Sequence, residues 1–455
     1  EECRSCRVLY YKKISYMRLL EFCRNKSFWF LDRLKGSAVK EALTILEKCE
    51  NSEWNDEEVF SYQQKQLIKL LKHCQNTVPI YGKIDSLKLC DWPILKKNDY
   101  REDYSKHLSI AYQKEKLFPM STSGSTGTPF VCYQDLGKRR HVYAEVLYYN
   151  GKVNYQIGKR IIYLRSIVGE CNKSVIQQIF QNIYLLDCQD LSDDGIEKKL
   201  NFIRKYTKNC DAMLMGYSST LDAFRRYFDK FGHEKAQGCN ISGIVGGSEM
   251  LFDNTRMSLE QAFHCKCVSR YANEENGFLG QDYTKNNIFI PNRANYYIEI
   301  LKLDSEESAE LNEVGRIVVT DLYNYAMPMI RYDTGDVGAW TIVKEHGVTR
   351  KAIGSFGGRI VDMIFDSEGK ALSPHSITNL MWRYQNIKQF QFAQIACKTY
   401  EMRLVIENGS INEKKMIDEL HVIVGKDAFL SIKYLSTIST AKSGKKKYIL
   451  NEMFS

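Results

Sequence analysis

Residues 121–129 form the segment of this sequence with the clearest potential for chemistry. They read Ser121-Thr122-Ser123-Gly124-Ser125-Thr126-Gly127-Thr128-Pro129, a loop of small hydroxyl residues and glycines without charge or bulk. The two glycines can adopt backbone angles that other residues avoid, so successive N–H groups can turn toward one concave point and bind an anion. A nucleotide polyphosphate is the natural ligand. A Walker A loop would need Gly-Lys-Ser/Thr at its end, which Thr128-Pro129 excludes, and a flexible Gly/Ser linker is the alternative.

Four segments further along the chain carry residues that could complete a site. They are Tyr271-Ala272-Asn273-Glu274-Glu275, Arg331-Tyr332-Asp333-Thr334-Gly335-Asp336, Gly358-Arg359-Ile360-Val361-Asp362-Met363-Ile364 and Thr440-Ala441-Lys442-Ser443-Gly444-Lys445. Taken alone, the first is also explained as an acidic turn, the second as a common Thr-Gly turn and the last as a solvated basic tail. Their order and spacing therefore carry more information than any one of them.

The elements that must position these segments follow from hydrophobic patterning. The first hundred residues read as helical, with an apolar stripe at Leu67, Ile68, Leu70, Leu71 and Cys74 that Val78-Pro79 closes. Residues 11–35 are basic and aromatic. This pattern predicts a helix that covers the core while its Lys and Arg side chains reach solvent, and a membrane-surface helix is the alternative.

Strand and helix patterns alternate between about residues 120 and 350. Buried strands are expected at 160–164, 243–245 and 316–320, with a helix at 221–231 between them. The alternation predicts an α/β domain with largely parallel sheets. Gly354–Gly358 is the predicted boundary, followed by a small α+β domain with strands at 390–395 and 403–406 and a helix at 413–424. The predicted domains are residues 1–357 and 358–455.

Composition narrows the class of protein. With 455 residues, 44% hydrophobic and 26% charged, the chain matches a globular protein of two or three domains. It has no run of about 18 apolar residues and no apolar signal core, so we expect no transmembrane segment and a cytoplasmic location. The net charge of +9 does not interleave with aromatic residues on one face, so no nucleic-acid partner is expected.

The fourteen cysteines are scattered along a large chain, which predicts reduced and mostly buried thiols. Cys3 and Cys6 form a lone CxxC pair. His264, Cys265 and Cys267 are closer together, but on a strand His264 would point away from the two thiols. The sequence leaves open whether either group binds a metal.

Together, the segments resemble the adenylate-forming enzymes, the superfamily of acyl-CoA synthetases and luciferases. The resemblance runs from about residue 60 to 450 and is nearest to the phenylacetate-CoA ligase branch with its CapK-like capsular-polysaccharide members. Two early markers of that branch are Val78-Pro79-Ile80-Tyr81 and Trp92-Pro93-Ile94-Leu95-Lys96-Lys97. The resemblance implies a large α/β domain with several sheets, a helical N-terminal segment and a small mobile α+β C-terminal domain.

The resemblance also implies roles for individual residues. Ser121 to Thr128 would hold the ATP phosphates, Glu275 would bind Mg²⁺, and the ring of Tyr271 would face the adenine. Asp336 and Arg359 would contact the ribose, Asp362 would be the hinge, and Lys445 would be the catalytic lysine. Ala272 and Glu274 depart from the Gly and Thr of the family motif, and the Glu274 position often contacts phosphate. The residues with a weaker expectation, as parts of an acyl pocket or as structural turns, are Tyr217, Gly246, Gly247, Ser248 and Glu249.

These residues predict an ATP- and Mg²⁺-dependent, AMP-forming ligase for an organic acid, with aryl acids favoured by the branch. CoA is the expected acceptor, and a sugar amine or hydroxyl of a glycan precursor is the enzymatic alternative. A nucleotide-binding protein that has lost catalysis is a third hypothesis, supported by the altered motif at 271–275. The sequence leaves open the identity of the acid and whether the chain forms a homodimer.

Overall fold

The computed structural model describes residues 4–122, 130–165, 174–188, 190–282, 287–345, 347–359, 364–369, 371–372, 377, 380–381, 383–384, 386–407, 409–438 and 448–453. Side chains are described from residue 19 onward, except at 122, 175, 345, 357–359 and 371. Several residues predicted from the sequence lie outside the described part: Cys3, Ser123, Gly124, Ser125, Thr126, Gly127, Thr128, Asp362, Lys442 and Lys445.

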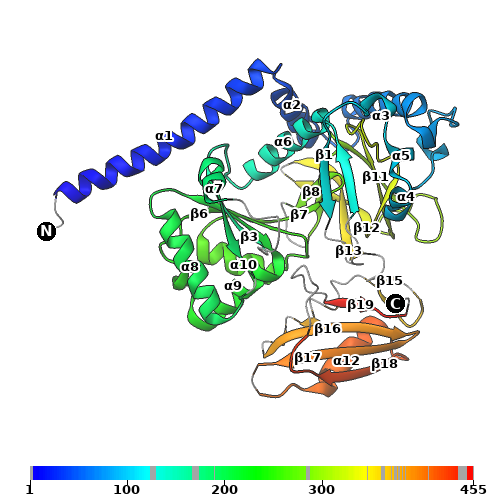
Figure 1. Ribbon diagram of the computed structural model, residues 1–455. Helices are drawn as coiled ribbons and strands as arrows, with labels where there is room; N and C mark the ends of the chain where they lie inside the picture. The colour runs from blue at the N-terminus through cyan, green and yellow to red at the C-terminus, as the bar shows by residue number, and fades with distance from the viewer. Residues whose placement is uncertain are drawn as a thin grey trace.

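A single eleven-stranded sheet dominates the fold (Figure 1). Its order is β10-β11-β12-β13-β9-β8-β7-β6-β5-β3-β4. The strands are β3 (Arg160–Arg165), β4 (Ile183–Asp187), β5 (Ala212–Tyr217), β6 (Ile241–Gly247), β7 (Cys267–Asn273), β8 (Gly277–Asp282), β9 (Phe289–Pro291), β10 (Tyr296–Leu301), β11 (Val314–Asp321), β12 (Tyr332–Glu345) and β13 (Val348–Arg359).

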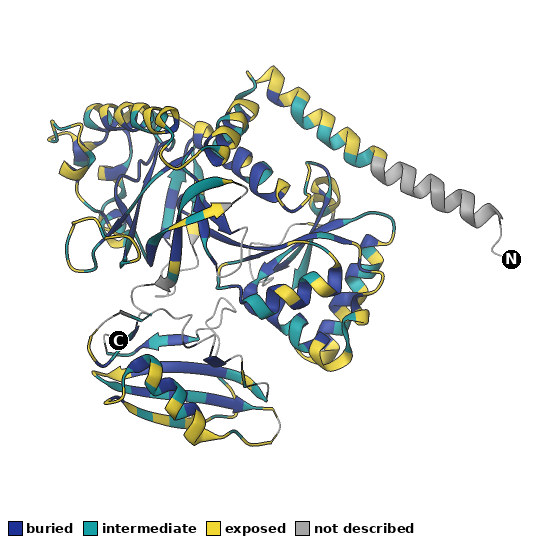
Figure 2. Ribbon diagram, turned by 180° about the vertical axis from the view of Figure 1, so that it is seen from behind, coloured by how far each residue is buried: buried dark blue, intermediate teal, exposed yellow. Residues whose placement is uncertain are grey.

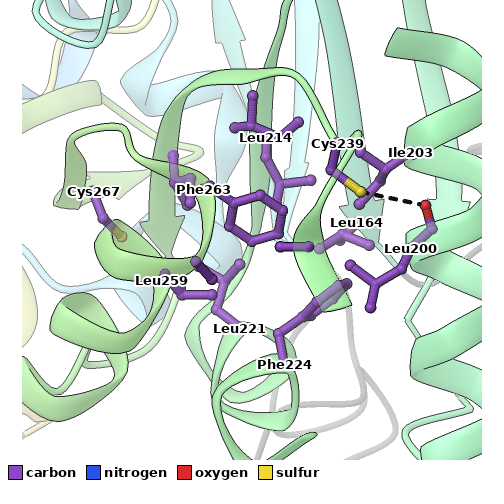
Figure 3. Packing of buried hydrophobic residues seen from close by; sticks show 14 of the residues in the cluster. Leu164, Leu200, Ile203, Leu214, Leu221, Phe224, Cys239, Leu259, Phe263 and Cys267 are labelled. Carbon is purple, nitrogen blue, oxygen red and sulfur yellow. Dashed lines mark hydrogen bonds between the residues drawn. The ribbon is translucent and has the colours of Figure 1, made fainter. Parts of the chain in front are cut away.

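Three helices cover the parallel part of this sheet and bury its core. They are α8 (Asp193–Thr207), α9 (Ser218–Phe231) and α10 (Asp253–Phe263). Leu221, Phe224 and Phe228 recur on one face of α9 at helical spacing and are buried. Figure 3 shows residues of these helices packed with Leu164 of β3 and Leu214 of β5. The Cys239 thiol donates to the carbonyl of Leu200 across 3.5 Å, which satisfies one polar group inside this core.

The first 181 residues hold further helices and a hairpin; the first helix extends away from the body, and the last packs beside β4 at the parallel edge of the sheet (Figure 1). The helices are α1 (Arg4–Leu34), α2 (Ala38–Asn51), α3 (Glu57–Thr77), α4 (Lys97–Glu102), α5 (Tyr104–His107), α6 (Leu136–Gly151) and α7 (Val175–Gln181), with short 3₁₀ turns at Pro79–Tyr81, Leu89–Asp91, Ile110–Tyr112 and, later, His233–Ala236. The hairpin joins β1 (Phe118–Thr122) to β2 (Phe130–Gln134). Of the predicted α3 stripe, Ile68 is exposed and the other four residues are buried.

A second sheet forms the C-terminal part of the chain. Its order is β18-β17-β16-β19, from β16 (Ile387–Ala396), β17 (Thr399–Ile406), β18 (Phe429–Tyr434) and β19 (Ile449–Asn451), and α12 (Glu413–Val424) packs on it through Met416 and Leu420. A short pair, β14 (Ile364–Phe365) and β15 (Ala371–Leu372), precedes it. The predicted fold class, a large α/β part with a helical N-terminus and a separate C-terminal sheet, is confirmed.

The large sheet is less parallel than predicted. The strands from β4 to β7 pair in parallel, whereas those from β7 to β10 along the sheet pair antiparallel. The antiparallel strands follow one another without helices between them, so no crossover can return the chain in the same direction. Residues Gly354–Gly358, the predicted boundary, lie in the last part of β13, which pairs with β12 up to Arg359.

The helix at the N-terminus does not cover the core as predicted. It leaves the body of the molecule, and its described half exposes large apolar side chains such as Phe22 and Phe30 (Figure 2). On its other side, Phe28 packs against Val39, Ala42 and Ala144. Within the described residues, no helix has the length and apolar character needed to cross a membrane.

The candidate metal residues are not arranged as a strand predicts. His264 ends α10 in a left-handed conformation with φ of 50°, and Cys267 begins β7. Among the described residues, no group of three or more His, Cys, Asp or Glu side chains could hold a metal ion. Six of the eleven described thiols are buried, in line with the expected reduced cysteines.

Candidate active site

Three of the predicted residues lie at the carboxyl ends of neighbouring parallel strands. Tyr217 ends β5 and is paired with Gly247, which ends β6. Gly247 is in turn paired with Arg270 of β7, so Tyr271 is the next residue beyond that row. In open α/β sheets this edge is where ligands bind, because strand ends and the loops after them leave a crevice.

Tyr271 connects this edge to the second half of the sheet. Its hydroxyl donates to Oδ2 of Asp336 at 2.9 Å, and the oxygen of Thr334 lies at 3.5 Å. The ring is buried and packs against Phe356 of β13 and Phe289 of β9, with centroids 4.6 and 6.0 Å apart. Burial, and then the nearby carboxylate of Asp336, raise the pKa of Tyr271 well above its ordinary value. The hydroxyl therefore stays protonated and serves as a donor.

Asp336 and Arg359 are direct cross-strand partners in β12 and β13. The sequence predicts both as nucleotide contacts from motifs 23 residues apart, and the register brings their backbones side by side. The side chain of Asp336 is half-buried and remains accessible from solvent.

The turn before Asp336 is held firmly. The N–H of Asp336 donates to the Thr334 hydroxyl at 3.1 Å, and this hydroxyl donates to the carbonyl of Ile317 at 2.9 Å. Gly335 has φ of +76°, a conformation that glycine adopts without strain, and its N–H donates to Asp333. Arg316 forms an ion pair with Asp333 at 3.1 Å. These contacts fix the direction of the Asp336 carboxylate.

Glu275 lies in the turn between β7 and β8 and is almost fully buried. Its Oε1 forms an ion pair with Lys97 at 2.7 Å and accepts from the hydroxyl of Tyr332 at 3.3 Å. Burial, followed by the charge of Glu275, raises the pKa of Tyr332 well above its ordinary value, so this phenol also remains a donor. Two donors thus orient the carboxylate.

The hairpin that flanks the predicted phosphate loop packs directly on this turn. Gln134 of β2 donates to the main-chain carbonyl of Glu275 at 3.2 Å, and the Cys132 thiol lies 3.8 Å from the same oxygen. Phe130, the first described residue after the loop, lies under the ammonium of Lys97 at 5.1 Å from its ring centre. Ser121, before the loop, is exposed. Strand β2 is thus held beside Glu275, and Phe130 at its start is paired with Thr122 of β1.

The turn after β6 contains a residue with a structural role, Glu249, and a residue that borders open space, Gly247. Oε2 of Glu249 accepts from the N–H of Ser219 at 2.8 Å, at the start of α9, so Glu249 caps that helix. Ser248 has a left-handed backbone with φ of 65°. A side chain at Gly246 would come within 3.2 Å of Ser218, whereas a side chain at Gly247 would meet nothing within 4 Å. Gly247 therefore borders open space, beside the half-buried Tyr217.

The C-terminal part of the chain contacts the large sheet's helices near this turn. Tyr448, three residues after Lys445, packs on Phe252 with ring centres 5.4 Å apart. Arg226 of α9 donates to the carbonyl of Lys388 in β16. Burial alone would raise the pKa of Asp222, but Arg226 and Arg225 outweigh it and hold that pKa below its ordinary value. Asp222 therefore keeps Arg226 directed at the C-terminal sheet.

Sequence reasoning missed two residues of this site, Lys97 and Tyr332. Lys97 is the last residue of the motif at 92–97, and Tyr332 follows Arg331 in the motif at 331–336. Neither motif predicts a role for these two residues. Their link to Glu275 depends on packing between α4, β12 and the β7–β8 turn. Local patterns cannot indicate such a contact.

Comparison with known proteins agrees with this architecture. The large sheet with its attached C-terminal sheet is the fold of adenylate-forming acid–CoA ligases. A 2-hydroxyisobutyryl-CoA ligase, crystallised in its postadenylation state with 2-HIB-AMP, matches with a TM-score of 0.67 at 14% identity, over 88% of this chain and 91% of the ligase chain. ATP-bound MatB from Rhodopseudomonas palustris matches with a TM-score of 0.52 at 13% identity, over 72% of this chain and 65% of its own.

Within that fold, the sequence is similar to one particular group. Residues 364–452 match the family model of the CapK C-terminal domain. Protein CapK of Staphylococcus aureus is 23% identical over 390 residues, which cover 82% of each chain. The resemblance that the motifs predict, to adenylate-forming enzymes and their CapK-like members, is confirmed.

Proposed function

We propose that this protein is an AMP-forming ligase that uses ATP and Mg²⁺ to convert an organic carboxylic acid into an acyl-adenylate and then transfers the acyl group. One observation carries the proposal: Tyr271 donates to Asp336, Arg359 is the cross-strand partner of Asp336, and the turn of Glu275 just after Tyr271 contacts the hairpin strand β2. The shared fold with acid–CoA ligases supports the same class of reaction.

The nucleotide would bind across the carboxyl edge of the large sheet. Asp336 accepts hydrogen bonds from the ribose hydroxyls, because an ionised carboxylate offers two acceptor oxygens. Tyr271 holds that carboxylate in place, and Arg359 adds a positive charge next to it. Backbone N–H groups and hydroxyls of Ser121 to Thr128 surround the phosphates.

The chemical step is attack of the acid's carboxylate oxygen on the α-phosphorus of ATP, with pyrophosphate as the leaving group. Negative charge is distributed over the phosphoryl oxygens, so positioning and cations contribute more than a base. Lys445 supplies an ammonium to the acid and the α-phosphate. Glu275 is suited to Mg²⁺, since this ion takes one or two carboxylates plus phosphate oxygens, and Mg²⁺ would neutralise charge on the phosphates. Lys97 and Tyr332 orient Glu275 for this contact.

The acid would lie between the ends of β5 and β6. Open space at Gly247 beside Tyr217 supports this position. After adenylation, residues 358–455 would rotate about Asp362 relative to residues 1–357 and carry Lys445 away from the phosphate. The Tyr448–Phe252 and Arg226–Lys388 contacts are the ones that this rotation must break.

CoA is the first candidate for the acceptor, because the structurally similar ligases act with it by their names. Similarity to Protein CapK favours a second candidate, an amine or hydroxyl of a surface-glycan precursor. A pyrophosphate-release screen over a panel of aliphatic and aryl acids, with and without CoA, tests the proposal. Release of pyrophosphate and AMP supports it. ADP and phosphate as products would refute it, and ATP binding without turnover on any acid would support a catalytically inactive nucleotide-binding protein.

A further inference from the structure

The N-terminal helix α1 and the neighbouring α7 expose more large apolar side chains than any other pair of contacting elements described above. On α1 these are Leu19, Phe22, Phe30, Leu31 and Leu34, and on α7 they are Ile176, Ile179 and Phe180. Phe30 is 62% exposed and Phe180 80% exposed. Monomeric proteins rarely leave contiguous apolar patches of this kind without a partner.

The exposed residues of α1 form one helical stripe. Leu19, Phe22, Lys26, Phe30 and Leu34 follow one another at spacings of three or four residues, which places them on a single face. The aliphatic part of the Lys26 side chain belongs to this stripe, and its ammonium lies over the Phe22 ring at 5.2 Å from the ring centre. Figure 2 shows this part of α1 largely exposed along its length.

The inward face of α1 carries both apolar and polar side chains, and both kinds contact the protein: Phe28 packs against Val39, Ala42 and Ala144. Arg24 donates to the carbonyls of Ile179 and Phe180 of α7 at 3.0 and 3.2 Å, and Asn25 donates to the carbonyl of Ile157 at 3.4 Å. At the end of the helix, Asp32 accepts the N–H groups of Val39 and Lys40. A surface helix of a globular protein normally has a polar outward face, whereas the outward face of α1 also carries large apolar side chains. The orientation of α1 is held by these polar contacts together with the packing of Phe28.

Charge identifies the partner. Residues 4–35 contain nine Lys and Arg against two Asp and Glu, a net charge of +7 in a chain whose total is +9. Both acids are withdrawn from the outward face, because Asp32 is buried and Glu21 is partly covered beside Lys159 and Arg160. Two copies of so positive a surface would repel each other, whereas an anionic lipid surface attracts it.

We propose that α1, with α7 beside it, is a membrane-surface anchor that binds the headgroup region of an anionic bilayer. The 31-residue helix would lie in the plane of the membrane over roughly 46 Å, at 1.5 Å per residue. Phe22, Phe30 and Leu34 enter the boundary between headgroups and acyl chains, and Lys26 and Arg33 contact lipid phosphates. This interaction is independent of the ligase reaction proposed above.

Vesicle co-sedimentation of the full chain tests the proposal. Vesicles of phosphatidylcholine alone are compared with vesicles that contain about 30% phosphatidylglycerol, at low salt and at 0.5 M NaCl, where the Debye length falls to a few ångström. The expected result is binding to the anionic vesicles at low salt, at least ~10-fold tighter than to phosphatidylcholine, and loss of most of that difference at high salt.

Matched variants distinguish specific binding through this surface of α1 from non-specific adsorption of the protein to vesicles. Phe22→Ser combined with Phe30→Ser should weaken binding at least ~10-fold, and Lys26→Glu combined with Arg33→Glu should remove the preference for anionic lipid. Phe429→Ser is the control, since Phe429 is 74% exposed on the C-terminal sheet, and it should bind as the parent does. All these positions are exposed, and circular dichroism checks that each variant is folded.

Three outcomes would overturn the proposal. The first is a folded parent chain that does not sediment with anionic vesicles, and the second is equal loss of binding in the Phe429 control. The third is a concentration-dependent dimer in analytical ultracentrifugation that the Phe22/Phe30 variant abolishes, which would make a second copy of the chain the occupant of this face.

Discussion

Replacement of Asp336 by Ala is the most direct test of the nucleotide site. The carboxylate is half-buried at a turn, accepts from Tyr271 at 2.9 Å and lies opposite Arg359 in the next strand. In the proposed complex it accepts two ribose hydroxyls, and hydrogen bonds to a charged acceptor contribute about 1.5 to 3 kcal/mol each. Because water partly replaces them, we expect a loss on the order of 2 to 4 kcal/mol, equal to roughly 30- to 1,000-fold in the dissociation constant.

Titration calorimetry with ATP and Mg²⁺, without an acid substrate, measures this change free of turnover. Two further variants separate the causes. Tyr271→Phe removes only the hydroxyl that orients the carboxylate, so it should weaken ATP binding by less than about 10-fold. Asp336→Asn keeps the shape but removes the charge, and its effect should lie between the other two. An unchanged ATP affinity in a folded Asp336→Ala variant would refute the reasoning and move the ribose site elsewhere.

Three further predictions concern other parts of the molecule. Lys445→Ala should slow adenylation about 10²- to 10³-fold while leaving acceptor acylation from preformed acyl-adenylate intact; equal loss in both half-reactions would contradict a moving lysine. Glu275→Gln should raise the Mg²⁺ concentration for half-maximal pyrophosphate release about 10-fold, and an unchanged Mg²⁺ dependence would assign Glu275 to holding Lys97 only. Burial raises the pKa of Glu50 from 4.5 to about 7, so its ionisation costs stability as pH rises from 4.5 through 7. Glu50→Gln should therefore be more stable than the parent by up to about 3 kcal/mol in urea at pH 8 but not at pH 4.5, and an equal difference at both pH values would argue against this titration.

The sequence predicts the elements of the fold better than their arrangement. The helix at Glu413–Val424 has the predicted bounds, and the strands at Arg160 and Gly243 lie where the apolar runs indicate. The antiparallel half of the sheet was missed because strand direction depends on the connections, and that half has hairpins in place of helical crossovers. Likewise, the basic and aromatic composition of residues 11–35 agrees with a helix but cannot say which of its aromatic side chains contact the core and which face solvent.

For the candidate site too, the sequence predicts individual residues better than the way they are arranged in space. Motifs name Tyr271, Asp336 and Arg359 one by one, but their meeting depends on the register between β12 and β13 and on a hydrogen bond between distant strands. Lys97 and Tyr332 could not be assigned, because only the packing of three separate elements brings them to Glu275. Long-range contacts of this kind leave no local signal in a single sequence.

The eleven-stranded sheet has a mechanically weak line that passes next to the candidate nucleotide site. Among the described residues, β9 and β13 share a single pair, Ile353 with Phe289, whereas β12 and β13 are paired along most of their length. Side chains also join the two halves across this line, among them the Tyr271–Phe356 ring contact and the hydrogen bonds of Tyr271 with Asp336 and of Tyr332 with Glu275. Because β9 has fewer backbone pairs with β13 than β12 has, its amides should exchange with deuterium faster than those of β12. A nucleotide that contacts both halves would join them and slow that exchange. The exchange rate of the β9 amides would therefore differ between the free and the nucleotide-bound protein.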